Sequence, residues 1–255
     1  MKKTLYLEAR KDDISKYVIF SGDPFRVEIL KQFLDNPIQV SHSREFNTYT
    51  GFYKGLKVTI TSTGIGSPSS AIAMEEMYEC GMEVALRMGT VMSLKEELLG
   101  HYIVPIASVR SERTSLTYVD RDYPAVADHE FVSIISEEVK KRNKICDNGL
   151  NLTLDGFYSL MKESRLSKEM SKDISKTFIK AKSIGIVGID MESSLILVLG
   201  RLMGVKTAVL TLASVLENLK GFLSEDERIK GEKELSLIAL DSIYEYSLRR
   251  KDAKV

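Results

Sequence analysis

Short apolar segments recur along this chain of 255 residues, and they limit its possible folds more than any other feature. Several are rich in valine and isoleucine and do not alternate with polar residues, which is typical of strands covered on both faces. Such strands need helices on both sides of a sheet and therefore favour an α/β architecture. The segments predicted as strands are 17–20, 56–62, 84–88, 102–109, 150–154, 184–189 and 207–215.

Helical patterns lie between these predicted strands. Ser67 opens one helix with a Ser-Pro-Ser-Ser sequence, and Asp128 is placed to cap another. Ser224 and Glu227 have the spacing of a capping box at the start of the last helix. The alternation of strands and helices predicts a sheet with a helix after most of its strands.

We expect residues 1–255 to form one α/β domain around a large sheet, because the sequence shows neither a Pro/Gly/Ser-rich linker nor an internal repeat. Residues 160–183 give the weakest pattern. They are rich in lysine and serine and predict a mobile flap or a surface helix.

Charge and cysteine content exclude several classes of protein. Lysine plus arginine and aspartate plus glutamate both number 36, so the formal net charge is zero, and neither a nucleic acid nor a membrane is an expected partner. Cys80 and Cys146 are expected to be free thiols, and the three histidines lack the spacing of metal ligands. No segment approaches the roughly 20 apolar residues of a membrane span. We therefore expect a soluble, cytoplasmic protein.

A predicted anion site follows the first strand. Gly22, an Asp-Pro pair and Arg26 come directly after residues 17–20. The glycine lets backbone N–H groups approach a ligand closely, and a guanidinium can bind a phosphate through two parallel hydrogen bonds. The same residues are typical of an ordinary turn, so this segment alone leaves both interpretations open.

Arg44 and Arg87 also lie in or beside strand-like segments. An arginine at a strand end is most often exposed, but Arg87 stands inside an apolar segment that predicts a buried strand. A buried charge without a partner costs several kcal/mol. A ligand anion at the carboxyl end of the sheet would supply that partner, and Thr90 would add a hydroxyl donor.

Acidic residues follow two of the later predicted strands. Asp190, Met191 and Glu192 precede a helical pattern, and Glu217 lies beside an asparagine. The first acids fit either a helix N-terminus, where they complement the dipole, or a carboxylate that binds a vicinal diol beside a packed thioether. Glu217 fits either a loop acid or a functional one.

Taken in order, these segments resemble the nucleoside phosphorylase-I family, which contains uridine phosphorylase, hexameric purine nucleoside phosphorylase and methylthioadenosine phosphorylase. The resemblance extends from about residue 17 to the last helix. It implies a single-domain, three-layer α/β/α fold with a large mixed central sheet, and an enzyme that converts a nucleoside and phosphate to a free base and (deoxy)ribose 1-phosphate. The matching segments are 22–26, 44–46, 62–69, 86–90, 107–110, 124–128 and 190–193.

The resemblance also implies the site residues. Arg87, Glu192 and Glu217 are the expected catalytic residues. Phosphate would be bound by Gly22, Arg26, Arg44, Arg87 and Thr90. The nucleoside would be bound by Thr90, Phe157, Met191 and Glu192.

The family pattern implies an assembly as well. Arg44 matches an arginine that reaches into a neighbouring subunit, so the expected assembly is a hexamer built as a trimer of dimers. No cofactor and no catalytic metal are implied, since phosphate is a co-substrate. Glu45, Ile65 and Ser69 match positions that hold a monovalent cation between subunits in some uridine phosphorylases.

Four departures from the family pattern affect the base site. Met92 replaces a loop glycine, and the Gln-x-Arg pair that reads uracil is replaced by residues 161–165, where Arg165 could substitute only if the loop shifts. Tyr6 lies near the place of an N-terminal histidine. Glu217 stands where purine-cleaving members carry an aspartate that protonates the base, and a glutamate with a raised pKa can serve the same purpose.

Uridine is the substrate that the sequence favours most. A purine or methylthioadenosine phosphorylase with Glu217 as general acid is the alternative. A nucleosidase would have no use for three convergent arginines, and a non-catalytic nucleoside-binding relative stays open because of the altered base loop.

Overall fold

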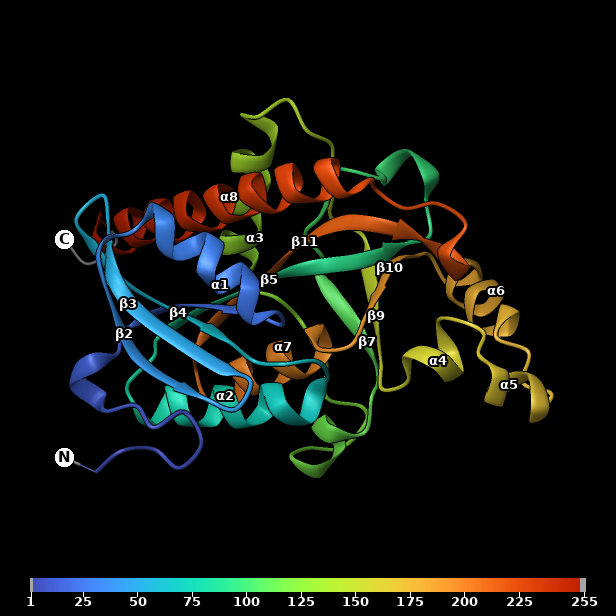
Figure 1. Ribbon diagram of the computed structural model, residues 1–255, viewed down its shortest axis with the longest axis horizontal. Coiled ribbons are helices and arrows are strands. Elements are labelled where there is room, and N and C mark those ends of the chain that lie inside the picture. The colour runs from blue at the N-terminus through green and yellow to red at the C-terminus, as the bar shows by residue number, and fades with distance from the viewer. Residues whose placement is uncertain (1, 253–255) are drawn as a thin grey trace.

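The computed structural model describes residues 2–252 and contains one large sheet (Figure 1). Its strands are β1 (Tyr17–Ser21), β2 (Asp35–Ser43), β3 (Phe46–Tyr53), β4 (Leu56–Ser62), β5 (Val84–Ser93), β6 (Tyr102–Ile103), β7 (Ala107–Ser111), β8 (Cys146–Asp147), β9 (Leu150–Leu154), β10 (Ile186–Asp190) and β11 (Lys206–Leu216).

The sheet is mixed, and the long strand β5 lies at its centre. The order is β2-β3-β4-β1-β5-β10-β9-β7, with β11 also paired to β5 and continued by β6 and β8. β1 and β11 run parallel to β5, whereas β10 runs antiparallel to it. Because β10 runs antiparallel to β5, its carboxyl end points toward the middle of β5. The residues that follow β10 therefore lie close to those in the middle of β5.

Helices cover both faces of the sheet. They are α1 (Pro24–Leu30), α2 (Ser67–Glu79), α3 (His129–Lys140), α4 (Phe157–Leu160), α5 (Arg165–Glu169), α6 (Ser175–Ser183), α7 (Ser193–Leu202) and α8 (Glu225–Asp252). Short 3-10 turns occupy Lys11–Asp13, Lys31–Phe33, Glu96–Leu98, Thr114–Thr117 and Glu217–Leu219.

Figure 1 shows α1, α3 and α8 on one face and α2 and α7 on the other, so the expected three-layer α/β/α architecture with a mixed central sheet is confirmed. Within residues 2–252, no helix has the length and apolar character needed to cross a membrane.

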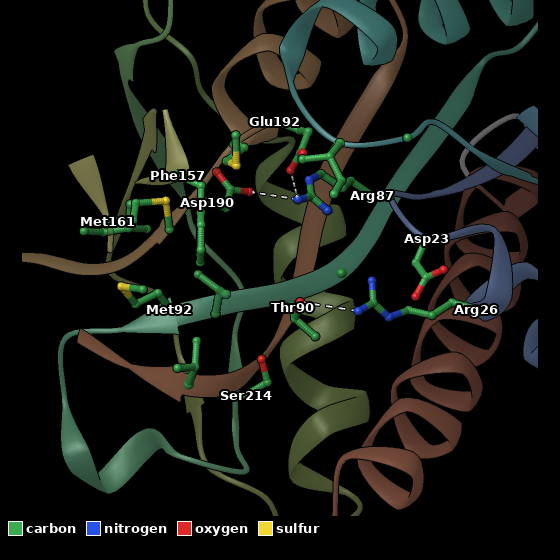
Figure 2. A pocket seen from close by; sticks show the side chains of 18 of the residues that line it. Asp23, Arg26, Arg87, Thr90, Met92, Phe157, Met161, Asp190, Glu192 and Ser214 are labelled. Carbon is green, nitrogen blue, oxygen red and sulfur yellow. Dashed lines mark hydrogen bonds and ion pairs between the residues drawn. The ribbon is translucent and has the colours of Figure 1, made fainter. Parts of the chain in front are cut away.

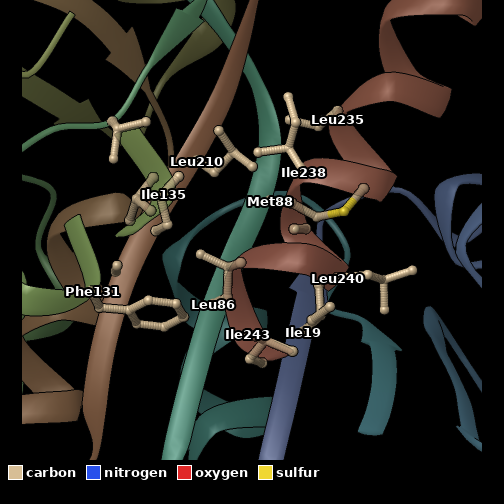
Figure 3. Close-up of a cluster of buried hydrophobic side chains, with 14 of the residues drawn as sticks. Ile19, Leu86, Met88, Phe131, Ile135, Leu210, Leu235, Ile238, Leu240 and Ile243 are labelled. Atoms are coloured by element: carbon tan, nitrogen blue, oxygen red, sulfur yellow. The ribbon is translucent and has the colours of Figure 1, made fainter. Parts of the chain in front are cut away.

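The core explains how an arginine can lie inside β5. Leu86 and Met88 face α8, together with Ile19 of β1, and pack on Leu235 and Ile238 (Figure 3). Successive side chains of a strand point to opposite faces, so Arg87 lies on the face away from this cluster. The apolar residues on either side of Arg87 therefore hold β5 in the core, while the Arg87 side chain points to the opposite face of the sheet.

The structure differs from the elements expected from the sequence in three places. Residues 35–53 form the hairpin β2–β3, which the sequence did not indicate because β2 is an exposed, polar edge strand. The predicted strand 102–109 is split into β6 and β7 around Pro105, which has no N–H for the ladder. The stretch 160–183, for which the sequence predicts a mobile flap or a surface helix, contains two short helices, α5 and α6, and its buried Phe178 packs with residues of β9 and β10.

The predicted helix caps are confirmed. Asp128 accepts a hydrogen bond from the Phe131 N–H at 3.0 Å. Ser224 and Glu227 form the reciprocal hydrogen bonds of a capping box. In α8 the buried face runs through Leu235, Ile238, Ile243 and Tyr246. The sequence predicts a buried stripe of Leu237, Leu240, Tyr244 and Leu248, of which Leu240 is buried and the other three are half-buried. Apolar residues follow one another without a gap at 237–240, so their spacing did not fix the helix orientation.

Candidate functional site

A cavity of about 420 Å³ lies where the carboxyl ends of β1, β10 and β11 meet the second half of β5 (Figure 2). Seven of the residues predicted from the sequence for phosphate, nucleoside or catalysis line it. They are Gly22, Arg26, Arg87, Thr90, Phe157, Met191 and Glu192. Two of the three arginines that the sequence predicts to converge, Arg26 and Arg87, therefore share one cavity with Glu192.

Arg87 is the central charged group of the cavity, with only 4 % of its surface exposed. Its Nη2 is paired with Asp190 Oδ2 at 3.2 Å and with Glu192 Oε2. Burial disfavours the charged form, but these two carboxylates outweigh it and raise the pKa of Arg87. The other terminal nitrogen, Nη1, has no protein partner in residues 2–252.

Gly89 makes room for the Arg87 guanidinium. The two residues are separated by one position on the same face of β5. A Cβ atom on Gly89 would lie 2.3 Å from Arg87 Nη1, which is far inside van der Waals contact. The glycine is therefore required for the observed position of the nitrogen that faces the cavity.

Glu192 is held from two sides. Its Oε1 accepts a hydrogen bond from the Gly66 N–H at 2.6 Å, and its Oε2 pairs with Arg87. Gly66 has φ = +96°, a conformation that favours glycine, and it precedes α2. Burial raises the pKa of Glu192; Arg87 opposes this shift, and the neighbouring Asp190 adds to it.

Asp190 is a buried part of this cluster. Its Oδ1 accepts hydrogen bonds of 2.9 Å from both Asn151 and Thr153 on β9, and its Oδ2 accepts one from the Ser193 N–H at 3.2 Å. Because all of these groups are fixed in β9 or at the start of α7, Asp190 is a rigid anchor for the Arg87 side chain.

Arg26 reaches the cavity from α1. Its Nε donates to Glu232 of α8 at 3.0 Å, and its Nη2 donates to Thr90 Oγ1 at 3.4 Å. Nη1 has no protein partner in the described part of the chain. Arg26, Thr90 and Arg87 thus present polar groups to one end of the cavity (Figure 2).

The opposite end of the cavity is apolar. Met92, which replaces the family glycine, is buried there together with Met161. Arg165 does not take the place of the missing uracil-reading arginine, because it lies on the exposed helix α5 and pairs with Glu169 at 2.8 Å. The other apolar residues at this end are Val91, Phe157, Ile189 and Val215.

Glu217 is not in the cavity, and this corrects the expectation that it acts as a catalytic acid. Its carboxylate pairs with Lys182 at 2.7 Å and with Lys220 at 3.3 Å, in a separate hollow beside α6. Burial alone would raise its pKa, but the two lysines outweigh this effect and lower it. A carboxylate of this kind does not hold a proton to donate near neutral pH.

Arg44 is also outside the cavity of its own chain. It lies in the exposed β2–β3 turn, with its guanidinium 5.3 Å from the centre of the Tyr6 ring. Its expected role in the site of a neighbouring subunit stays a prediction.

The positions expected for a monovalent cation do lie close to one another. A Cβ on Gly64 would be 2.9 Å from Glu45 Cγ and 3.4 Å from Ser69 Oγ, and Ser69 donates to the Ile65 carbonyl at 3.3 Å. The cation itself stays a prediction. In residues 2–252, no three His, Cys, Asp or Glu side chains gather in a way that could hold a metal ion.

Sequence reasoning missed four residues of the site: Asp190 as the partner of Arg87, Glu232, Met161 and Ser214. Asp190 was visible as the first acid of a pair separated by one residue, a spacing that allows both acids to reach one cation. The other three carry no local signal, because the sheet topology brings them to the cavity.

Comparison with known proteins identifies the family. A family model described as the phosphorylase superfamily matches residues 16–238, and the chain belongs to that superfamily. Uridine phosphorylase from Thermococcus kodakarensis is 28% identical over 239 residues, which are 93% of this chain and 84% of that protein. A DeoD-type purine nucleoside phosphorylase from Buchnera aphidicola is 30% identical over 247 residues, 94% of this chain and 99% of that protein.

The fold comparison agrees. The crystal structure of uridine phosphorylase from Vibrio fischeri ES114 in complex with 6-hydroxy-1-naphthoic acid matches with a TM-score of 0.83 and 29% identity, over 96% of this chain and 98% of that one. The family and the fold expected from the sequence are confirmed, and so is the expectation of an enzyme of the nucleoside phosphorylase kind.

We predict that Glu192 takes up its proton at a higher pH than an ordinary glutamate, and Glu217 at a lower pH. Burial beside Asp190 destabilises the charged form of Glu192, whereas two lysines stabilise that of Glu217. Carboxyl ¹³C chemical shifts of labelled glutamate, followed through a pH titration and assigned with Glu192→Gln and Glu217→Gln, measure both values. Titration of Glu192 below Glu217 would contradict this electrostatic description of the site.

Proposed function

We propose that this protein catalyses the phosphorolysis of a nucleoside, with uridine as the preferred substrate, to the free base and ribose 1-phosphate. The observation that carries the proposal is the order of groups along one cavity. Arg26, Arg87 and Thr90 lie at one end, the carboxylate of Glu192 lies next to them, and an apolar wall follows. Phosphate, pentose and base need these three environments in this order.

Phosphate would bind between the two arginines. Nη1 of Arg26 and both Nε and Nη1 of Arg87 have no protein partner in the described part of the chain, and the Thr90 hydroxyl lies beside Arg26. Fixed donors of this kind hold a phosphate oxygen in position for attack and shield it from water. The attacking oxygen forms a bond to C1′ of the ribose, and the C1′–N bond breaks with its electron pair leaving on the base.

Glu192 would hold the ribose. Its carboxylate is fixed by Gly66 and Arg87 and can still accept hydrogen bonds from the 2′- and 3′-hydroxyls. Phe157 and Met191 line the cavity beside it and offer packing surfaces for the base and the sugar ring. The ion pair with Arg87 therefore links the group that binds phosphate to the group that binds the pentose.

The position of Glu217 favours uridine over a purine. The purine alternative required Glu217 as a general acid, and this carboxylate faces two lysines outside the cavity. At the apolar end, the described lining residues include no titratable side chain. A purine nucleoside remains the second candidate, because a DeoD-type purine nucleoside phosphorylase is 30% identical over 94% of this chain.

The charges of the cavity support a shared site between two copies of the chain. Among the described lining residues, Arg26 and Arg87 face Asp23, Asp190 and Glu192, so acids outnumber cations. A phosphate dianion entering such a cavity needs further positive charge. Arg44 is exposed in the β2–β3 turn beside the Tyr6 ring and would supply this charge to a second copy. We therefore extend the proposal to a homo-oligomer, a hexamer built as a trimer of dimers.

The function is tested by cleavage of uridine, inosine, adenosine and methylthioadenosine with and without phosphate. We expect uridine to be cleaved fastest and only with phosphate, and Arg87→Ala to abolish turnover in a folded protein because the cavity loses its central cation. Chromatography of base and ribose 1-phosphate measures the reaction, and circular dichroism checks the fold. Cleavage without phosphate would indicate a nucleosidase, and binding without cleavage a non-catalytic relative; either result would refute the proposal.

The shared site is tested by mixing two inactive variants, Arg44→Ala and Arg87→Ala, after subunit dissociation and reassembly. A mixed dimer would contain one site with both arginines intact, so we expect recovery of about a quarter of wild-type activity at equal amounts. Each variant reassembled alone is the control. If Arg44 acted within its own chain or not at all, the mixture would show no more activity than the sum of the two variants.

A further inference from the structure

Ser214 occupies an irregular position in β11, directly beside the cavity. Ala213 pairs with Val91 of β5 and Val215 pairs with the next residue, Met92, so Ser214 has no partner in β5. This extra residue is a β-bulge, a feature that changes the direction of a side chain in a strand. In a regular strand, Ser214 and Val215 would point to opposite faces, whereas here both line the cavity.

The backbone around Ser214 is fixed, but its hydroxyl is free. The Ser214 carbonyl accepts a hydrogen bond from the Leu223 N–H at 3.0 Å, and the Leu216 N–H donates to the Gly221 carbonyl at 2.8 Å. Within the described part of the chain, the Ser214 hydroxyl has no hydrogen-bond partner. Figure 2 shows its oxygen directed toward the space between Thr90 and Met92.

The Ser214 hydroxyl lies among mainly apolar residues of the cavity. Met92, Met161 and Val215 belong to the apolar end of the cavity, and the arginine and glutamate expected there lie elsewhere. Beyond Thr90, Ser214 is the uncharged polar side chain that the described lining residues offer to a base. A base has polar atoms on its edge, and leaving them unpaired in an apolar cavity costs binding energy.

We propose that Ser214 is the specificity-determining residue of this site, with its hydroxyl bonded to the polar edge of an uncharged nucleobase. The inference rests on the proposed nucleoside phosphorolysis and names how the base is recognised. A hydroxyl both donates and accepts, so it can serve a carbonyl oxygen or a ring N–H of uracil without a fixed charge. The thioethers of Met92 and Met161 would pack on the faces of the ring.

Ser214→Ala tests this inference, with Ser214→Thr to restore a hydroxyl and Ser133→Ala on the exposed surface of α3 as a matched control. We expect Ser214→Ala to lower kcat/KM for uridine by roughly threefold to tenfold, the effect of losing one neutral hydrogen bond, while KM for phosphate stays within about twofold. The threonine variant should recover part of the loss, and Ser133→Ala should equal wild type. A purely structural defect would change both substrates together.

Calorimetric titration with free uracil separates this inference from the proposed function. If wild type cleaves uridine and Ser214→Ala matches it in both kcat/KM and uracil affinity, Ser214 is not the specificity residue. If wild type cleaves no nucleoside, the proposed function is wrong, and weaker uracil binding by Ser214→Ala than by wild type still supports the contact. If wild type neither cleaves a nucleoside nor binds uracil, both proposals are overturned.

Discussion

The structure depends on one buried interaction, in which Arg87 is neutralised by two carboxylates. A guanidinium in the middle of a sheet costs several kcal/mol unless acids are held beside it. Asp190 and Glu192 meet this requirement because β10 runs antiparallel to β5 and ends next to it. Since the acids engage only Nη2, the pairing fixes the guanidinium and leaves Nη1 directed at the cavity. Under the proposed function, the ion pair that neutralises Arg87 would thus also prepare a site for an anion.

The pairing of Arg87 with Asp190 and Glu192 also explains why the cavity has one charged end and one apolar end. Charged groups gather where α1, β5 and the start of α7 meet, and the bulged end of β11, together with Phe157 of α4 and the adjacent Met161, supplies apolar surface. The ionised groups are nearly balanced, with a small excess of acid. Under the proposed function, a cavity of this kind would bind a phosphate weakly by itself, and the exposed Arg44 of another copy would supply the missing positive charge. Catalysis and assembly would then depend on the same charge.

The sequence predicted those parts of the site that follow from local chemistry. A charged residue inside an apolar segment marked Arg87, and a glycine before an arginine marked Gly22 and Arg26. Contacts set by distant parts of the chain could not be predicted, as Arg26 and Glu232 show, since they are separated by 206 positions. Glu217 was wrongly predicted to act in the cavity for the same reason. Its carboxylate pairs with Lys182, which lies on a different element, α6. The bulge at Ser214 depends on strand register, which a sequence does not display.

Calorimetric titration of inorganic phosphate into wild type and Gly89→Ala tests the central claim most directly. The added methyl group would overlap the position of Arg87 Nη1, so it must displace the nitrogen that faces the cavity. If Nη1 binds the anion, wild type binds phosphate and the folded variant binds it at least about tenfold more weakly. Equal affinities, with unchanged thermal unfolding, would contradict the account by showing that phosphate does not depend on this guanidinium.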